Sequence, residues 1–242
     1  MTQLVNKSLG DIVSEHNSTA AIFNKYHLDY CSLGDLPLSE YLANKDISLG
    51  QLPDELKLAI DNEPADNINF NALSLTEISQ IIRNTYHEYL RNKISELSTL
   101  SQKVKNKHEI EEVDKIHELL LSIFNYLAPH ILKEEKTLFP YLEYMEHTVL
   151  KGKMPKPPSF GKVKQSVSSM IDDHRDSTEN LNKLRELTKN YLCPKNTDDD
   201  IRRFYRELNY LDKNLRMHIH IENNVLFKKA RAMEEKIISE EG

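Results

Sequence analysis

The amino-acid sequence predicts an all-α fold, an up-down four-helix bundle preceded by a small helical domain. Glycine is rare and tryptophan is absent among the 242 residues, and Lys, Glu, Leu, Asn and Ile dominate, a composition typical of helical proteins. Four long segments repeat apolar residues at intervals of three and four, which is the period of an amphipathic helix. Because short connections join these segments, we expect neighbouring helices to run antiparallel as a bundle.

The first 62 residues are expected to form a small domain of their own. A polar stretch that contains Pro64 separates them from the four long segments, and such a stretch interrupts helices. We interpret residues 63–73 as a linker and residues 74–242 as the bundle. In the small domain (1–62), helices are expected at about 8–26, 37–44 and 52–61.

The four bundle helices can be delimited from the signals at their ends. Ser74 and Glu77 have the spacing of a capping box, which begins a helix. The acidic run after Thr197 suits the N-terminus of the last helix, and a loop rich in proline and glycine precedes the third. The expected helices cover about 74–106, 109–147, 162–191 and 197–237.

Charge and cysteine content exclude several classes of protein. The formal net charge is −6 and no basic stripe is concentrated along the chain, which argues against nucleic acid or an anionic membrane as a partner. The N-terminal residues lack the layout of a signal peptide, and no apolar run has the length of a membrane span. Two cysteines, Cys31 and Cys193, give no disulfide framework. We therefore expect a soluble protein of the reducing cytoplasm.

The most informative motif occurs twice. One copy contains His130 and Glu134, the other contains His218 and Glu222, and in each copy Leu-Phe begins four residues after the glutamate. Residues four apart lie on the same face of a helix. Each copy therefore directs an imidazole and a carboxylate the same way, and apolar residues at helical spacing lead up to both.

A further histidine precedes each copy at nearly the same distance. His87 lies 43 residues before His130, and His174 lies 44 residues before His218. The chain thus repeats a unit of one histidine followed by a His-x-x-x-Glu pair. In a four-helix bundle, such residues on facing helices can hold two metal ions in the core.

Two explanations fit the buried glutamates Glu134 and Glu222. A buried carboxylate is costly without a partner, so something must compensate. A core network of hydrogen-bonded histidines and glutamates would do so, and for a single histidine on an apolar face we would prefer that explanation. The doubled pattern favours a metal site instead. Imidazole and carboxylate ligands without a nearby thiolate favour iron or manganese over structural zinc.

The predicted site has two metal ions. The histidines are expected to be terminal nitrogen donors and the glutamates to be bridges, with water, a bridging oxide or hydroxide, or another side chain in the remaining positions. Glu135 and Asp173 are the nearest candidates for an outer shell or an extra ligand. The six predicted ligands are His87, His130, Glu134, His174, His218 and Glu222.

Three other histidines are not expected to reach the metals. His220 lies two residues past His218 and points to the other side of its helix. His108 and His117 precede His130 by 22 and 13 residues. At about 1.5 Å per residue they lie roughly 33 and 20 Å away along a continuous helix.

These motifs resemble those of a known family, the iron–sulfur cluster repair di-iron proteins, also called Repair of Iron Centers. The resemblance covers essentially the whole chain. It rests on Tyr86-His87, Asp173-His174 and both His-x-x-x-Glu segments in the bundle, and on the stretch Ala20–Cys31 in the small domain. It implies a hemerythrin-like bundle behind a ScdA-type N-terminal domain. It also implies two non-haem iron ions with carboxylate and oxo or hydroxo bridges, and it suggests a homodimer.

The chain departs from this family at Cys31. The family's stretch ends in two adjacent cysteines, whereas Ser32 follows Cys31 here. A role that needs an intramolecular disulfide or a pair of thiols is therefore not expected. Two interpretations of Cys31 stay open, a small packing residue and a catalytic thiol that reacts or touches metal. His27, Asp29 and Ser32, which are close in sequence, are compatible with the second.

The resemblance implies a stress-response protein that helps restore iron–sulfur clusters damaged by nitric oxide or peroxide. Its clients would be the damaged iron–sulfur proteins, and we expect it to donate iron to them rather than to act as an enzyme. One alternative is an enzyme that reduces nitric oxide at the di-iron centre. Another is a hemerythrin-like protein that carries or senses dioxygen or nitric oxide. The separate N-terminal domain argues against simple oxygen carriage, because a carrier needs only the bundle.

Overall fold

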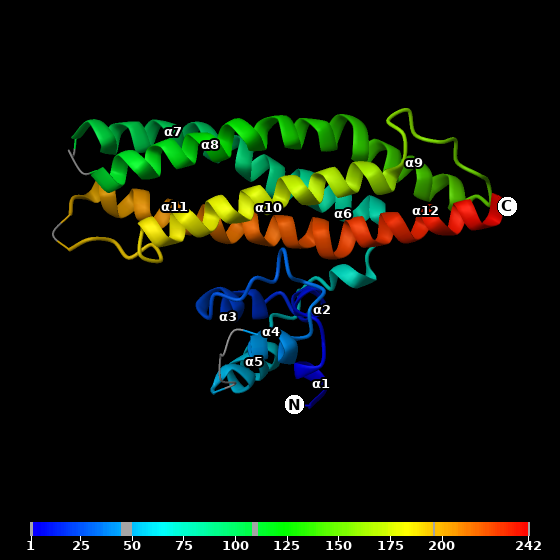
Figure 1. Cartoon of the computed structure of the whole chain (residues 1–242), viewed down its shortest axis with the longest axis horizontal. Coiled ribbons are helices and arrows are strands. Elements are labelled where there is room, and N and C mark those ends of the chain that lie inside the picture. The colour runs from blue at the N-terminus through cyan, green and yellow to red at the C-terminus, as the bar shows by residue number, and fades with distance from the viewer. Residues whose placement is uncertain (1, 45–49, 108–110, 196, 242) are drawn as a thin grey trace. The chain divides into compact units, whose positions relative to one another are not determined.

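The computed structural model describes residues 2–44, 50–107, 111–195 and 197–241. Across these ranges the regular structure is helical, which confirms the predicted all-α class (Figure 1). None of the described helices combines the length and the apolar character that a membrane-spanning segment needs. The chain divides into two compact units. We call Ser79–Arg216 the long-helix unit, and Met1–Ile78 together with Met217–Gly242 the terminal unit.

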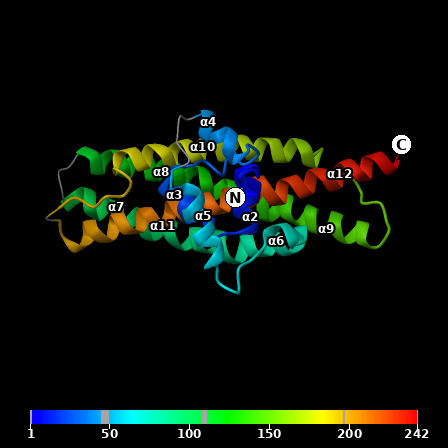
Figure 2. The same ribbon diagram turned by 90° about the horizontal axis from the view of Figure 1, so that it is seen from below.

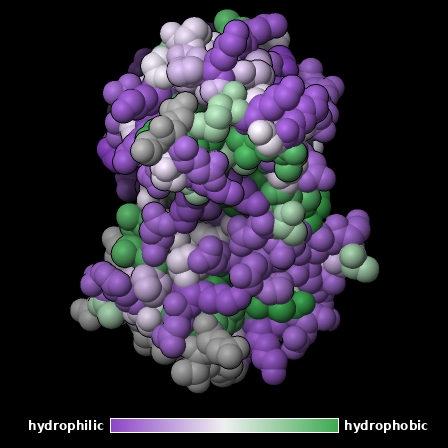
Figure 3. All heavy atoms as spheres, turned by 90° about the vertical axis from the view of Figure 1, so that its right-hand side faces the viewer, coloured by the Kyte–Doolittle hydropathy of each residue, from purple (hydrophilic) through white to green (hydrophobic). Residues whose placement is uncertain are grey.

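The long-helix unit has an apolar interior between extended helices. α8 packs against both α7 and α10, and Figure 1 and Figure 2 show these three side by side. On the face of the whole chain shown in Figure 3, hydrophilic spheres outnumber hydrophobic ones, as expected when apolar side chains lie inside. The elements are η2 (Ile82–His87), α7 (Glu88–Lys107), α8 (Glu111–Lys133), η3 (Glu134–Leu138), α9 (Phe139–Leu150), α10 (Val163–Leu187) and α11 (Asp199–Ile221) as far as Arg216. Fully buried core residues include Leu90, Leu97, Ile116, Leu120, Val167, Met170 and Leu208.

The predicted bundle helices correspond closely to the observed ones except at their C-termini. The second and the fourth continue a few residues further than expected, to Leu150 and Glu241, whereas the third ends early. α10 was expected to continue to about residue 191 but ends at Leu187. The next residues include Lys189, Asn190 and Tyr191, with φ of 49°, 59° and 61°. Three successive left-handed residues cannot continue a right-handed helix. The chain therefore leaves α10 about one turn earlier than its apolar pattern indicates.

The terminal unit contains short helices around its own apolar core. Its elements are α1 (Thr2–Val5), α2 (Leu9–Glu15), α3 (Thr19–Lys25), α4 (Leu38–Asn44), α5 (Leu52–Asp61), η1 (Phe70–Ala72), α6 (Leu75–Ile81) as far as Ile78, the end of α11, η4 (Glu222–Leu226) and α12 (Phe227–Glu241). α3 packs on α5, and α2 packs on η4. Fully buried residues include Leu9, Ile12, Phe23, Tyr30, Leu52 and Phe227.

The expected single helix over residues 8–26 is wrong. Two helices are present, α2 and α3, and His16, which follows α2, has φ of −135° and ψ of 85°. The backbone N–H of Ser18 donates to Oε1 of Glu63 at 3.2 Å. A distant carboxylate thus takes the N–H that a continuous helix would have used. The amphipathic pattern could not show this contact.

The capping box at the start of α6 is confirmed. The backbone N–H of Ser74 donates to Oε2 of Glu77 at 2.8 Å, and the backbone N–H of Glu77 donates to Oγ of Ser74 at 3.2 Å. Two amides that a helix N-terminus leaves without intrahelical partners are satisfied in this way. The local sequence alone was enough to place this helix start.

The segment predicted as a linker, residues 63–73, is tied to its surroundings by hydrogen bonds. Asn67 donates its side-chain amide to the carbonyl of Glu15 at 3.1 Å, and Asn17 donates to the carbonyl of Ile68 at 3.1 Å. Lys229 donates to the carbonyl of Leu73 at 2.6 Å. The segment belongs to the same compact unit as α5 and the first residues of α6. The domain boundaries at residues 62 and 74 stay a prediction.

Replacing Glu63 with glutamine is expected to destabilise the protein by about 1–2 kcal/mol at neutral pH, as for charged hydrogen bonds at a partly exposed site. Burial would raise the pKa of Glu63, but hydrogen bonds from His16 and Ser18 outweigh it and hold the pKa below 4.5. The ionised form is thus favoured by folding, so its contribution is complete above about pH 4.5 and is lost as pH falls through the folded pKa. Urea unfolding at pH 7 and pH 3 measures both effects.

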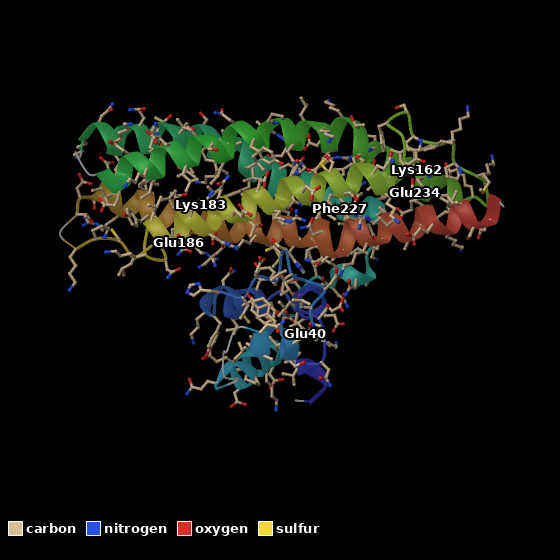
Figure 4. All side chains as sticks on the ribbon, viewed as in Figure 1. Glu40, Lys162, Lys183, Glu186, Phe227 and Glu234 are labelled. Carbon is tan, nitrogen blue, oxygen red and sulfur yellow. The ribbon has the colours of Figure 1, made fainter. Side chains whose placement is uncertain are left out.

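The matched control is Glu40→Gln. Glu40 is exposed on α4, where Figure 4 labels it. We expect this variant to unfold like the wild type at either pH. An equal loss of stability for Glu63→Gln at pH 7 and at pH 3 would contradict the ionised hydrogen-bonded carboxylate.

Candidate metal centre

Three of the predicted ligands lie at the ends of π-helical turns. Glu134 begins η3, Glu222 begins η4, and His87 ends η2. A π-helical turn closes its hydrogen bonds between residues five apart rather than four, and such turns are frequent at functional sites. In both motif copies the turn covers the same five positions, from the glutamate to the leucine. The repeat is therefore one of backbone geometry as well as of sequence.

In the long-helix unit, the carboxylate of Glu134 lies between two histidines. The side chain is fully buried. Its Oε2 lies 3.4 Å from Nε2 of His87, and its Oε1 lies 3.3 Å from Nε2 of His130. Each carboxylate oxygen faces a different imidazole. This is the arrangement expected of a carboxylate that bridges two metal ions.

His174, on α10, joins the same cluster. Its Nε2 lies 2.9 Å from Nε2 of His130. The ligand atoms that His130, Glu134 and His174 offer all lie within 4.8 Å of one another, and the three side chains are buried. Imidazole nitrogens and carboxylate oxygens that converge in a buried place match the ligand preferences of iron and manganese. The residues therefore fit the predicted metal.

The outer ring nitrogens of two histidines face carboxylates. Nδ1 of His87 lies 2.9 Å from Oε1 of Glu135, and Nδ1 of His130 lies 3.5 Å from Oδ2 of Asp173. The contact with His130 lowers the pKa of Asp173. A carboxylate on the outer nitrogen fixes the tautomer and orientation of a metal-binding histidine and raises its basicity. Both outer-shell candidates from the sequence thus lie beside a predicted ligand.

Further residues, which the sequence analysis did not single out, hold His87 in place. Arg91 donates two guanidinium N–H groups to Oε1 of Glu135, at 3.0 and 2.9 Å. The ring of Phe139 stacks on that of His87, with 5.7 Å between centroids and 9° between planes. Arg83 lies over the Phe139 ring, 5.4 Å from its centroid. The Leu-Phe pair that ends each motif copy was the sequence signal that could have identified Phe139 as part of the site.

The second motif copy lies in the terminal unit. Nε2 of His218 lies 2.8 Å from Oε1 of Glu222, and both side chains are buried. α11 runs from Asp199 to Ile221 and passes directly into η4. The helix that carries this pair therefore begins in the unit that contains the other four predicted ligands.

The histidines predicted not to bind metal have other surroundings. Nδ1 of His117 lies 2.8 Å from Oγ of Ser101. Nε2 of His220 lies 3.2 Å from Oγ of Ser14, and burial lowers the pKa of His220 to about 3, so this ring is neutral at physiological pH. His108 lies outside the described residues.

Cys31, the predicted catalytic thiol, is buried in a loop of the terminal unit. Its backbone N–H donates to Oδ1 of Asp29 at 3.2 Å, and its carbonyl accepts from the side-chain amide of Asn224 at 3.3 Å. Within the described ranges, neither Cys31 nor Cys193 forms a disulfide. These contacts involve the backbone of Cys31, so a role for its thiol stays a prediction.

The chain is similar to known proteins over nearly its full length. The family described as "Hemerythrin HHE cation binding domain" matches residues 83–230, and ScdA_N, described as "Domain of Unknown function (DUF542)", matches residues 5–59. The iron-sulfur cluster repair protein ScdA of Staphylococcus haemolyticus is 28% identical over 93% of this chain and 99% of that protein. The iron-sulfur cluster repair proteins YtfE of Pectobacterium carotovorum and Escherichia coli are each 29% identical. They cover 93% and 95% of this chain, and 96% and 98% of their own length.

These similarities confirm the resemblance that the motifs indicated. The hemerythrin match covers more than half of the chain and contains all six predicted ligands. The ScdA_N match contains Cys31. The relatives are similar across both matched regions and over almost their whole length. The chain therefore belongs to the hemerythrin HHE cation-binding family and carries a ScdA_N domain before its hemerythrin region.

Proposed function

We propose that this chain is a di-iron protein that repairs damaged iron–sulfur clusters by donating iron. The observation that carries the proposal is Glu134, whose two carboxylate oxygens face His87 and His130 separately. A cation-binding family match includes these residues. Relatives named for iron–sulfur cluster repair, similar over more than nine-tenths of the chain, support the choice of iron and of this task.

All six predicted ligands belong to the proposed centre. Four of them, His87, His130, Glu134 and His174, lie within one compact unit. We infer that His218 and Glu222 complete the set, because α11, which begins in that unit, carries His218 and passes directly into η4, which begins with Glu222. Glu134 and Glu222 would be the bridges and the histidines terminal donors.

The chain's own residues would both hold iron and leave it exchangeable. Bound iron supplies a redox-active ion that is also the cargo to be transferred. Glu135 and Arg91 keep His87 in one orientation. Six side chains cannot fill the coordination positions of two six-coordinate ions, even when both carboxylates bridge. The remaining positions would be open to exchangeable ligands, among them a thiolate or sulfide of a damaged client.

Iron per chain in protein purified without oxygen tests the first part of the proposal. We expect about two irons per chain, as for a bundle with two such ligand units. Incubation with an apo iron–sulfur protein, sulfide and reductant should then restore the cluster absorption of the client, while a ferrous chelator added first should prevent this. One iron or none after resupply of ferrous iron would favour the hydrogen-bonded polar core.

Nitric oxide distinguishes donation from catalysis. With nitric oxide and an electron donor, we expect no sustained formation of nitrous oxide. Nitrous oxide made over many turnovers, with both irons retained and no transfer to the client, would establish a reductase instead.

We further propose a cytoplasmic location, damaged iron–sulfur proteins as clients and a homodimer. Light scattering after gel filtration tests the homodimer.

A further inference from the structure

The two copies of the repeated motif differ at positions that do not bind metal. Where the first copy has Leu132, the second has His220, and where the first has Lys136, the second has Asn224. Leu132 is 56% exposed and Lys136 is exposed, whereas His220 is fully buried and Asn224 is 8% exposed. Burying polar groups is costly unless hydrogen bonds satisfy them. The second copy therefore has a task beyond holding a ligand.

Asn224 forms hydrogen bonds with the backbone of residues 30–34, which we call the Cys31 segment. Its side-chain amide nitrogen donates to the carbonyl of Tyr30 at 3.0 Å and of Cys31 at 3.3 Å. It also lies 3.1 Å from Nδ1 of His220. Asn223 donates to the carbonyl of Cys31 at 3.4 Å. One short turn of η4 thus holds two successive carbonyl groups of the loop.

His220 extends this contact to α2. Nδ1 of His220 lies 3.1 Å from the amide nitrogen of Asn224 and 3.4 Å from the carbonyl of Tyr30, and Nε2 faces Oγ of Ser14 at 3.2 Å. The Ser14 hydroxyl in turn donates to the carbonyl of Gly10 at 2.8 Å. The His220 ring meets the Tyr30 ring edge-on at 5.4 Å between centroids. These contacts give the buried polar groups hydrogen-bonding partners, as a buried network requires.

The Cys31 segment lies close enough to Asn224 to require glycine. A Cβ added at Gly34 would lie 2.1 Å from Oδ1 of Asn224, and one at Gly10 would lie 3.0 Å from its Cγ. The backbone N–H of Gly10 donates to the carbonyl of Gly34 at 2.8 Å. Both backbones therefore fit against the Asn224 side chain, with no room for a larger residue at Gly34.

We propose that His220 and Asn224 are positioning residues that clamp the Cys31 segment to the turn carrying Glu222, so that the accessibility of Cys31 depends on metal at Glu222. This rests on the proposed di-iron function. Glu222 and Asn224 are two residues apart in the same π-helical turn. A π-helical turn has an alternative α-helical register, and coupling requires an element of this kind with two arrangements. Metal bound to Glu222 fixes the hydrogen-bond register of η4. That register determines the position of the Asn224 amide, which bonds to the Cys31 carbonyl.

The test is the alkylation rate of Cys31 with iodoacetamide, in a Cys193→Ser background where Cys31 is the only thiol. Iron is counted in every sample. With ferrous iron bound, Cys31 should react slowly. After removal of iron with a chelator it should react about tenfold faster, since local opening governs access to a buried group. Asn224→Ala should react faster than the background in both states, and its two rates should become nearly equal.

The matched control is Lys136→Ala, the corresponding position of the first copy, which should keep the full iron-dependent difference. Ser14→Ala removes only the hydroxyl that faces His220 and should reduce the difference in part. If Asn224→Ala does not fold, the alkylation rates of Ser14→Ala test the proposal in its place. A merely structural role for Asn224 would change stability but leave the ratio of the two rates intact, and that result would overturn the proposal.

Failure of the proposed function has a different signature. If the background protein binds no iron after ferrous resupply, the di-iron function and the metal dependence fail together. The clamp itself is then judged by whether Asn224→Ala reacts faster than Lys136→Ala without metal. If two irons bind but their removal leaves the alkylation rate unchanged, the di-iron function stands and the coupling is refuted.

Discussion

Replacing Glu134 with leucine is expected to remove at least one iron while the helices stay formed. The carboxylate is fully buried, and its oxygens face His87 and His130 at 3.4 and 3.3 Å, so the substitution takes a ligand from both sides of the proposed centre. Leucine has a comparable size and keeps the interior filled. Iron per chain and far-UV circular dichroism measure the two outcomes.

The same substitution should change stability in opposite directions with and without iron. Without metal, the substitution removes a carboxylate that is costly to bury and fills its place with an apolar group, so we expect no loss of stability. With free iron at 100 times its Kd, the wild type gains about 2.7 kcal/mol from binding, whereas Glu134→Leu should gain less. Urea unfolding of both proteins in both states gives the sign directly.

Glu179→Leu is the matched control, because Glu179 is exposed on α10. It should keep the wild-type iron content. Retention of both irons by Glu134→Leu and by Glu222→Leu would refute the bridging assignment. A polar core without metal would instead give the same stability change for Glu134→Leu whether or not iron is supplied.

Features that depend on local periodicity could be predicted from the sequence. The spacing of four between His130 and Glu134 places both side chains on one helix face whatever the rest of the fold does, and the capping box at Ser74 needs only residues three apart. The nearly equal spacing in the two halves of the chain identified His87 and His174 as the remaining histidine ligands. For these reasons the helices and the cluster around Glu134 could be predicted from the sequence.

Features that depend on distant contacts could not be predicted. Glu135 was a candidate for the outer shell, but its partner His87 lies 48 residues away and could not be identified, and the Ser14 hydroxyl meets His220 across 206 residues. Neither spacing has a period that a pattern could reveal. The π-helical turns were missed for a different reason. Their residues also suit an α-helix, and the choice between the two registers depends on what the side chains contact.

The second large effect is expected for Asp212→Asn, which should lower the free energy of unfolding by about 3–5 kcal/mol, the range for breaking a buried ion pair. Asp212 is fully buried in the long-helix unit. Its Oδ2 accepts from Nε of Arg185 at 3.0 Å, and its Oδ1 accepts from Nε of Arg216 at 2.9 Å. Arg216 also donates to Asn182 at 2.8 Å. The substitution removes the shared carboxylate and leaves two guanidinium groups close together.

Asp199→Asn is the control, because it makes the same chemical change at an exposed position of the same helix. Asp199 is almost fully exposed and pairs with Arg202, and solvent screens such a pair, so little change is expected. A double-mutant cycle that combines Asp212→Asn with Arg216→Met should show strong non-additivity, since both substitutions break one network. Additive losses would mean that the two side chains stabilise the fold independently.

Asp212 and His218 lie six residues apart on α11, so the two variants also separate stability from metal binding. Asp212→Asn should unfold at lower urea yet keep its iron while it is folded, because Asp212 is not a proposed ligand. Glu134→Leu should do the reverse, with less iron and no loss of stability in the metal-free state. Loss of iron from folded Asp212→Asn would show that this ion network also determines the geometry of the ligands that follow it on the helix.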